Sequence, residues 1–343
     1  MRTIALPLLG AALVSMACAE DWIAFGQGAT VQKSGETLSL QYKIAAGQFA
    51  MAVLPIPGGK LAGMTHLQFR LRTDASTVVA VMLSEKKPGG DYTAAFWSPK
   101  DEWQQIDLTP ADFAVNDGPK DPKDPDGRLD LDQVEHIAVL DLGQFFSQVD
   151  SPMATHRLTG EHKFDLEALH LVAEPGKADA HGVVIDDFHR SFLGWFTPGG
   201  GELALSKSNA LGKPALEFHY QQAADKIAAV LHGLGQTSLR DAKELAFDVT
   251  STRDAHLVIV LEGQKIDGRQ GPRYNLDFTV TAGQVGHMSM PFSEFTLGDD
   301  SPPDPDGRLN LSKVRTISLA DVSGLLSGES AANTIWIADL RAQ

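Results

Sequence analysis

An all-β protein made of two tandem β-sandwiches is the fold that this sequence of 343 residues predicts. The hexapeptide DPDGRL occurs twice, at Asp124–Leu129 and at Asp304–Leu309. Short runs such as HLQFRLRTD and YNLDFTV alternate apolar with polar residues, and clusters of Gly, Pro, Asp and Asn separate them, which is typical of sandwiches and barrels. No stretch sustains a helical apolar stripe for more than about three turns.

The first 19 residues have the pattern of a secretory signal peptide. Arg2 supplies a positive charge, an apolar run follows as far as Met16, and ACA (17–19) fits the small-x-small pattern before a cleavage point. The run is shorter than the roughly 20 apolar residues that span a bilayer, and no later stretch is long and apolar enough to do so. We therefore expect a periplasmic or extracellular protein without a membrane span.

Cys18, the only cysteine, allows two versions of this export signal. Cleavage after Ala19 would give a mature chain without cysteine, whose stability depends on packing alone. Acylation of Cys18 would instead tether the chain as a lipoprotein. Ser15 stands where a lipoprotein signal usually has an aliphatic residue, so the sequence favours the first version and leaves a lipid anchor at Cys18 open.

An ordered series of similar residues indicates that the chain is a tandem duplication. We expect a first sandwich over residues 20–173, a linker rich in Pro and Gly over 174–182, and a second sandwich over 183–343. In both copies the segment after DPDGRL predicts a short turn that leads into a strand. The corresponding aromatic pairs are Tyr42 and Tyr220, Phe69 and Phe247, Tyr92 and Tyr274, Phe96 and Phe278, and Phe113 and Phe295.

The repeated hexapeptide has two interpretations. Asp-x-Asp-Gly followed by a further Asp or Asn presents the hard oxygens that calcium prefers. Both copies nevertheless lack the first Asp and the terminal Glu of an EF-hand loop. A structural turn is simpler, since Pro fixes φ, Asp caps the turn and Gly accepts a positive φ. The sequence favours the turn and no cofactor, and it leaves a structural calcium ion open, with the candidate ligands Asp124, Asp126, Asp304 and Asp306.

The second copy carries a characteristic order of segments. It opens with IDDF (185–188) and Trp195 and closes with IWIADL (335–340), and in the first copy Trp103 leads the strand WQQIDL (103–108). This order resembles the galactose-binding-like β-sandwich superfamily, in particular family-eleven-type carbohydrate-binding modules and the complex I assembly-factor domain. The resemblance covers both copies and implies jelly-roll sandwiches, with glycan binding as one of several functions of that superfamily. The first copy lacks the IDDF opening, and the second has Val285 in place of the strand's Trp.

Charge and motifs exclude several classes of function. The chain has 29 basic and 44 acidic residues, a net charge of −15, and no Lys/Arg cluster that could follow a phosphate backbone or an anionic membrane. We therefore expect no nucleic-acid partner. The sequence contains no Gly-rich phosphate loop, no His-Glu-x-x-His helix and no Gly-x-Ser-x-Gly elbow. Since its histidines and paired carboxylates form no recognisable catalytic set, no catalytic residue is assigned.

Trp97 is the aromatic residue that we expect to point outward from a sandwich. It lies on the opposite strand face from Phe96, and its counterpart in the second copy is Thr279. A flat indole stacks on the C–H faces of sugar rings while neighbouring polar groups bind the hydroxyls. Trp103, by contrast, is assigned to the core. The candidate ligand-binding residues, which alternation places off the core-facing side, are Trp97, Arg70, Arg72 and Glu85.

The sequence thus predicts an exported, non-catalytic protein that recognises a glycan or another component of the cell envelope. The alternative is a structural or protein-interaction module that binds no small ligand. An unusual carbohydrate-active enzyme is the third hypothesis.

Overall fold

The computed structural model describes residues 12–15, 22–118, 120–148, 158–173, 183–198, 200–265, 270–328 and 330–343. The predicted linker and most of the predicted signal peptide lie outside these residues.

Strands dominate the structure. Among the described residues no helix is long and apolar enough to cross a membrane. The helices are α1 (Gly143–Phe146) and α2 (Ser323–Ser327), with 3-10 turns at Pro110–Asp112, Leu131–Gln133, Phe292–Glu294 and Leu311–Lys313.

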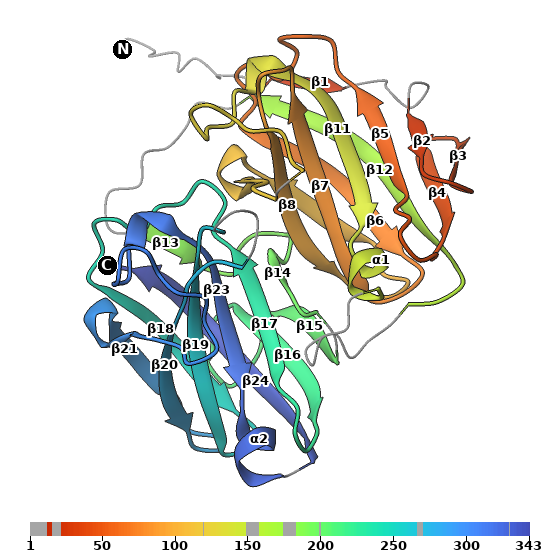
Figure 1. The fold of residues 1–343 in the computed structure, drawn as a ribbon. Coiled ribbons are helices and arrows are strands. Elements are labelled where there is room, and N and C mark those ends of the chain that lie inside the picture. The colour runs from red at the N-terminus through yellow and green to blue at the C-terminus, as the bar shows by residue number, and fades with distance from the viewer. Residues whose placement is uncertain are drawn as a thin grey trace, which may run out of the picture.

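The first sandwich consists of two antiparallel sheets (Figure 1). Sheet 1A has the order β3-β4-β12-β6-β9, and β1 also pairs with β12. Its strands are β1 (Ala12–Ser15), β3 (Thr30–Ser34), β4 (Thr37–Lys43), β6 (His66–Thr73), β9 (Gln104–Leu108) and β12 (Glu161–Ala173). Sheet 1B has the order β10-β8-β7-β11-β5-β2. Its strands are β2 (Ile23–Phe25), β5 (Met51–Pro55), β7 (Thr77–Glu85), β8 (Asp91–Ser98), β10 (Ala114–Val115) and β11 (Val134–Asp141).

The second sandwich repeats this arrangement. Sheet 2A has the order β15-β16-β24-β18-β21, and β13 also pairs with β24. Its strands are β13 (Val183–Asp186), β15 (Gly201–Ser206), β16 (Ala215–Gln222), β18 (Glu244–Ser251), β21 (Gly286–Pro291) and β24 (Ala331–Ala342). Sheet 2B has the order β14-β17-β23-β19-β20-β22. Its strands are β14 (Trp195–Phe196), β17 (Ala228–Gly233), β19 (Ala255–Gly263), β20 (Arg273–Val280), β22 (Thr296–Leu297) and β23 (Val314–Asp321).

Alternation along the strands places the core between the two sheets of each sandwich, as the sequence predicts. On β6 the side chains of Leu67, Phe69 and Leu71 are at most 1% exposed, whereas the polar residues between them face outward. The predicted turn-to-strand segments are also confirmed, because a 3-10 turn precedes β11 and another precedes β23. The all-β fold of two duplicated sandwiches is therefore confirmed.

The two sandwiches pack directly against each other (Figure 1). Phe192, in the segment before β14, belongs to the first core, where its ring lies 6.4 Å from that of Phe96 in an edge-to-face contact. In return, Val78 and Trp97 of sheet 1B belong to the second core. A backbone hydrogen bond of 2.8 Å from Gln236 N to Ala111 O adds to this interface. Each sandwich thus supplies residues to the core of the other.

Candidate functional site

The structure does not bring the four predicted ligand-binding residues together. Trp97 and Glu85 lie on sheet 1B, on β8 and at the end of β7, whereas Arg70 and Arg72 lie on β6 of sheet 1A. Trp97 does point away from Phe96, but it is 4% exposed because the second sandwich covers this face. Trp97 thus points outward from its own sandwich as predicted, but its expected exposure is wrong, since alternation gives the face of a side chain and not what packs on it.

Glu85 is also misplaced by the prediction. It shares the core-facing side of β7 with Val81 and Leu83 and is 9% exposed. Its carboxylate accepts hydrogen bonds from the backbone N–H groups of Gly90, at 2.9 Å, and Asp130, at 2.5 Å. Burial raises the pKa of Glu85, although these two hydrogen bonds oppose the rise. Glu85 therefore holds two loops together inside the protein.

Arg70 and Arg72 lie together on the outer face of sheet 1A, around a tryptophan that the sequence assigns to the core. The guanidinium carbons of Arg70 and Arg72 lie 5.0 and 4.8 Å from the ring centroid of Trp103, which is within cation–π distance. Trp103 itself is half-buried. Its predicted core position is wrong. The prediction took the counterpart residue, Val285, for a core residue, but Val285 is 43% exposed. We call this surface the Trp103 face.

Two carboxylates of β12 fix the arginines of the Trp103 face. Arg70 Nη1 donates to Glu167 Oε1 at 2.5 Å, and Arg72 Nη2 donates to Asp165 Oδ2 at 2.6 Å. Ser39 Oγ donates to the other oxygen of Asp165, also at 2.6 Å. Burial raises the pKa of Asp165, but the hydrogen bonds from Ser39 and Arg72 outweigh burial and lower it below its usual range. The face is thus a half-buried indole within a fixed polar array.

Sheet 2A carries a comparable surface, which we call the Trp336 face and which the sequence reasoning missed. Trp336 on β24 lies between the core residues Ile335 and Ile337 and is half-buried on the outer side. Its Nε1 donates to Glu217 Oε2 at 2.8 Å, and the other oxygen of Glu217 contacts His219 Nε2. The alternation of IWI was a sufficient signal, since it predicts that the middle residue points outward.

Hydrogen bonds also hold the carboxylates of the Trp336 face in their ionised form. Burial raises the pKa of Glu217, but hydrogen bonds from Trp336, Ser206 and His219 outweigh it, so the pKa is lowered. On the neighbouring β18, Asp248 contacts Lys213 Nζ and His287 Nδ1, both at 2.6 Å. Burial raises the pKa of Asp248 as well, and these two contacts outweigh burial and lower it.

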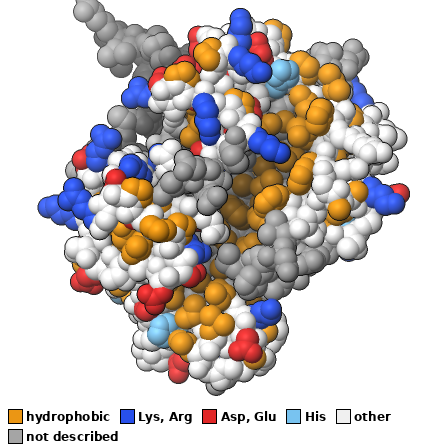
Figure 2. Space-filling view, viewed as in Figure 1, with side chains coloured by type: hydrophobic (Ala, Val, Ile, Leu, Met, Phe, Trp, Pro, Cys, Tyr) orange, Lys and Arg blue, Asp and Glu red, His pale blue; other side chains and the backbone are white. Residues whose placement is uncertain are grey.

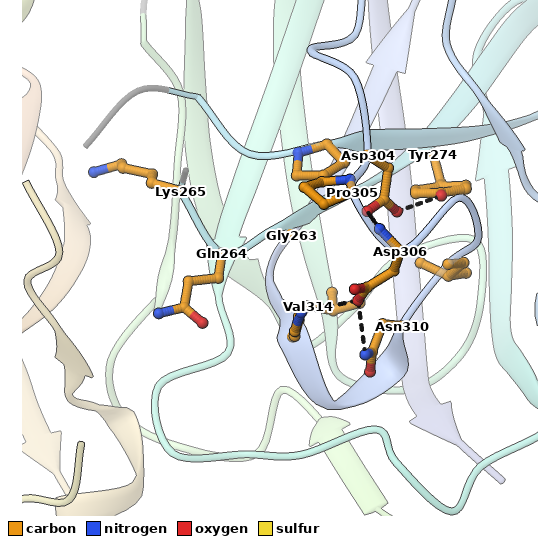
Figure 3. Close-up of a pocket in the computed structure, with 12 residues that line it drawn as sticks. Gly263, Gln264, Lys265, Tyr274, Asp304, Pro305, Asp306, Asn310 and Val314 are labelled. Carbon is orange, nitrogen blue, oxygen red and sulfur yellow. Dashed lines mark hydrogen bonds and ion pairs between the residues drawn. The ribbon is translucent and has the colours of Figure 1, made fainter. Parts of the chain in front are cut away.

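The DPDGRL segments form hydrogen-bonded turns. In the second copy Asp304 accepts from the hydroxyl of Tyr274 at 2.5 Å and from the backbone N–H of Asp306 at 2.8 Å (Figure 3). Asp306 in turn accepts from Asn310 Nδ2 at 3.0 Å and from Lys313 Nζ at 2.8 Å. These residues line a pocket of about 290 Å³.

The first copy uses its aspartates in the same way. Asp124 accepts from the hydroxyl of Tyr92 and from the backbone N–H of Asp126, and Asp126 accepts from the backbone N–H of Arg128. Within the described part of the chain, no group of three or more His, Cys, Asp and Glu side chains is placed to hold a metal ion. The carboxylates thus serve the turn, and calcium binding at Asp124, Asp126, Asp304 and Asp306 stays a prediction.

Apolar side chains gather over the first sandwich on the side seen in Figure 2, with basic side chains around them. Several large apolar residues of this sandwich are strongly exposed. They are Ile23 (57%), Phe25 (62%), Phe49 (38%) and Phe145 (48%).

The solved structures to which this chain is similar include carbohydrate-binding modules. No protein-family profile and no curated protein matches it. Among solved structures it is similar to the family 11 module of the cellulase Lic26A-Cel5E of Clostridium thermocellum, with 16% identity, a TM-score of 0.37, and coverage of 48% of this chain and 95% of that one. It is also similar to the CBM22-1-CBM22-2 tandem of Paenibacillus barcinonensis Xyn10C, with 10% identity, a TM-score of 0.35, and coverage of 97% and 96%. The first of these is a module of the type that the sequence resembles.

Proposed function

We propose that this protein binds a glycan, without catalysis, through the Trp103 face and the Trp336 face. One observation carries the proposal. Each sandwich holds one half-buried tryptophan on the outer side of the corresponding sheet, 1A or 2A, and polar groups fixed by hydrogen bonds surround it. An indole provides the flat apolar surface for a sugar ring, and fixed carboxylates, guanidinium groups and hydroxyls provide partners for sugar hydroxyls. Preorganisation of these partners reduces the entropic cost of binding.

On the Trp103 and Trp336 faces, the lowered pKa values of the carboxylates favour binding over hydrolysis. A glycosidase needs a carboxylic acid that is still protonated near neutral pH, which requires a raised pKa. The pKa values of Asp165, Glu217 and Asp248 are all lowered. They are therefore ionised at neutral pH and serve as hydrogen-bond acceptors. The net charge of −15 favours a neutral glycan over a polyanionic one.

We also propose that the protein is exported and that its N-terminal segment is a signal peptide. The charged Arg2, the apolar run and ACA (17–19) support this. Cleavage after Ala19 would remove β1, which pairs with β12 through Ala12–Ser15. Mass spectrometry of protein recovered from a secreting host should give Glu20 as the first residue. A chain that begins with a diacylated Cys18 would show the lipid anchor instead, and an intact N-terminus would contradict export by cleavage.

A glycan-array screen of residues 20–343, in buffer with calcium and in buffer with chelator, tests the binding function. We expect binding to neutral glycans in both buffers, because the DPDGRL carboxylates are engaged within their own turns. Trp336→Ala and Trp103→Ala should each weaken binding about tenfold or more, because each removes the stacking surface of one face. Trp336→Phe, which keeps a flat ring, is the matched control and should lose less.

Three outcomes would count against parts of this proposal. Failure to bind any glycan in either buffer would overturn glycan recognition. Full affinity in the double variant Trp103→Ala/Trp336→Ala would overturn the assignment of the two faces. Binding that is lost only with chelator would support the calcium prediction for the DPDGRL aspartates.

A protein-interaction module is the second candidate, and the exposed apolar side chains of the first sandwich favour it. The rings of Phe49 and Phe145 lie 6.3 Å apart, and Ile23 and Phe25 are both exposed on β2, so these residues are not singly scattered. Sedimentation velocity over a range of concentrations distinguishes the two functions. Association that disappears in Phe25→Ser/Phe145→Ser, together with an empty glycan array, would favour the interaction module.

A further inference from the structure

We infer that the Trp336 face continues into a cavity between the two sandwiches, where Trp97 of the first sandwich completes a site for a neutral oligosaccharide. This inference rests on the proposed glycan binding and adds a second sandwich to one site. The cavity has a volume of about 420 Å³, within the usual range of roughly 300–1,000 Å³ for small-molecule sites. Trp97 and Ser76 line it from the first sandwich, and Glu202, His219, Gln221 and Thr334 are among the residues that line it from the second.

The cavity and the Trp336 face share residues. His219 and Thr334 line the cavity, and they are joined to each other by a hydrogen bond of 2.8 Å between Nδ1 and Oγ1. His219 also contacts Glu217, which accepts from Trp336. Because residues advance by about 3.4 Å along a strand, Thr334 lies only about 7 Å along β24 from Trp336. One extended ligand can therefore touch Trp336 and enter the cavity.

Trp97 lines this cavity and carries an unused hydrogen-bond donor. The residue is 4% exposed, and its Nε1–H has no partner among the described residues. Buried tryptophans usually find a partner for this group, and leaving a buried donor unpaired costs about 1–3 kcal/mol. A ligand oxygen in the cavity would remove that cost.

A residue that lines the adjoining cavity carries an unused acceptor. That cavity, of about 190 Å³, shares Gly200 and Gln221 with the first one and is also lined by Gln222. Gln222 is 2% exposed, and its Oε1 has no partner among the described residues, although its Nε2 donates to Lys226 O at 2.8 Å. A sugar hydroxyl both accepts and donates hydrogen bonds, so sugar hydroxyls match this pair of groups.

The charges of the cavity indicate a neutral ligand. Glu202 is the one carboxylate among the described residues that line it, and no Lys or Arg side chain lines it to neutralise an anionic sugar. The ligand class is therefore a neutral oligosaccharide long enough to reach from Trp336 to Trp97. Short sugars would occupy the Trp336 face alone, so affinity should rise with chain length.

Calorimetric titration of residues 20–343 with cello- and xylo-oligosaccharides of two to six units tests this site. Trp97→Phe keeps an aromatic ring for packing but removes the Nε1 donor. We expect it to weaken binding of the longest oligosaccharide that binds by about five- to tenfold and to leave the shortest one unchanged. Gln221→Ala, at an exposed position in the cavity, should give the same dependence on length.

The matched control is Lys43→Ala, since Lys43 is the counterpart of Gln221 in the first copy, directly after the corresponding Tyr42 and Tyr220. It should leave all affinities unchanged. The inference would be overturned, while glycan binding stands, if Trp97→Phe lost the same affinity for oligosaccharides of every length. It would also be overturned if neither Trp97→Phe nor Gln221→Ala lost affinity. If none of the oligosaccharides binds and Trp336→Ala has no effect on the glycan array, the proposed function fails together with the inference.

Discussion

Asp165 is the residue that organises the polar array of the Trp103 face. Its side chain is 4% exposed, and it accepts hydrogen bonds from Ser39 and Arg72. Arg72 is thereby fixed beside the ring of Trp103. The position of the guanidinium, and with it the environment of the indole, therefore depends on one buried carboxylate.

Asp165→Asn should destabilise the protein at neutral pH and have a smaller effect in acid. The pKa of Asp165 is lowered in the folded state, so its stabilising contribution is present above the unfolded pKa of about 3.9 and is lost as the pH falls through the folded value. At pH 7 we expect a loss of about 2 kcal/mol in the free energy of unfolding. Urea unfolding at neutral and acid pH measures the difference. Asp277→Asn, at an exposed position, is the control, and an equal loss at both pH values would contradict this account.

Single residues show what alternation can and cannot predict. It places Leu67, Phe69 and Leu71 in the core correctly, and it would have placed Trp336 outside. It gives the correct face for Trp97 but not its burial, because the outer face of sheet 1B at this residue is covered by another part of the chain. The carboxylate that fixes Arg72 beside Trp103 could not be predicted either, because Asp165 lies 62 positions from Trp103 and reaches the face through sheet pairing.

At the scale of elements, the DPDGRL turn joins a loop to the next strand through its own hydrogen bonds. The glycine of each copy has a positive φ, +69° at Gly127 and +63° at Gly307, in the left-handed region that favours glycine. No atom lies within 4 Å of the place where a side-chain β-carbon would stand at either glycine. The conformation of the backbone, and not space, therefore requires glycine here.

Gly307→Ala should lower the free energy of unfolding by about 1–2 kcal/mol, because alanine in the left-handed region is strained. Gly307→Asn should lose less, since asparagine tolerates this region. Thermal unfolding of the two variants measures the difference, and Gly127→Ala gives the same test in the first copy. If the alanine variants were as stable as the natural chain, the turn would not depend on the positive φ.

The strands and turns were the most predictable elements. The repeat and the alternating runs predict two sandwiches, and the turn residues predict the short 3-10 turns before β11 and β23. Sheet order could not be predicted in this way, because pairs such as β12 with β4 join segments more than 100 residues apart. Local patterns contain no information about such partners.

At the scale of the whole molecule, the exchange of core residues couples the two sandwiches. Phe192 is 7% exposed, packs edge-to-face on Phe96, and also lies beneath the guanidinium of Arg190, 4.1 Å from its ring. Trp97 makes the reciprocal contact with the second core. We therefore expect the two sandwiches to unfold together, in one transition.

Phe192→Ala should separate this transition into two. Removal of a buried aromatic ring lowers the free energy of unfolding by about 3–5 kcal/mol. Here the ring belongs to the contact between the sandwiches, so its removal weakens that contact. Differential scanning calorimetry should show one peak for the natural chain and two for the variant. Phe25→Ala, at a position that is 62% exposed, is the control and should keep a single peak. Two peaks in the natural chain would contradict the coupling.

The apolar pair through which the first sandwich contacts its neighbour is replaced by polar residues in the second sandwich. Val78 and Trp97 are cross-strand partners on the first copy, and the equivalent partners on the second are His256 and Thr279. Identical units that join head to tail can add further units without limit, since every free end offers the same surface. Here the second unit offers a polar pair in place of the apolar one, as the capping units of repeat proteins do. The apolar contact that Val78 and Trp97 make with the neighbouring core is thus not offered at the equivalent positions of the second sandwich.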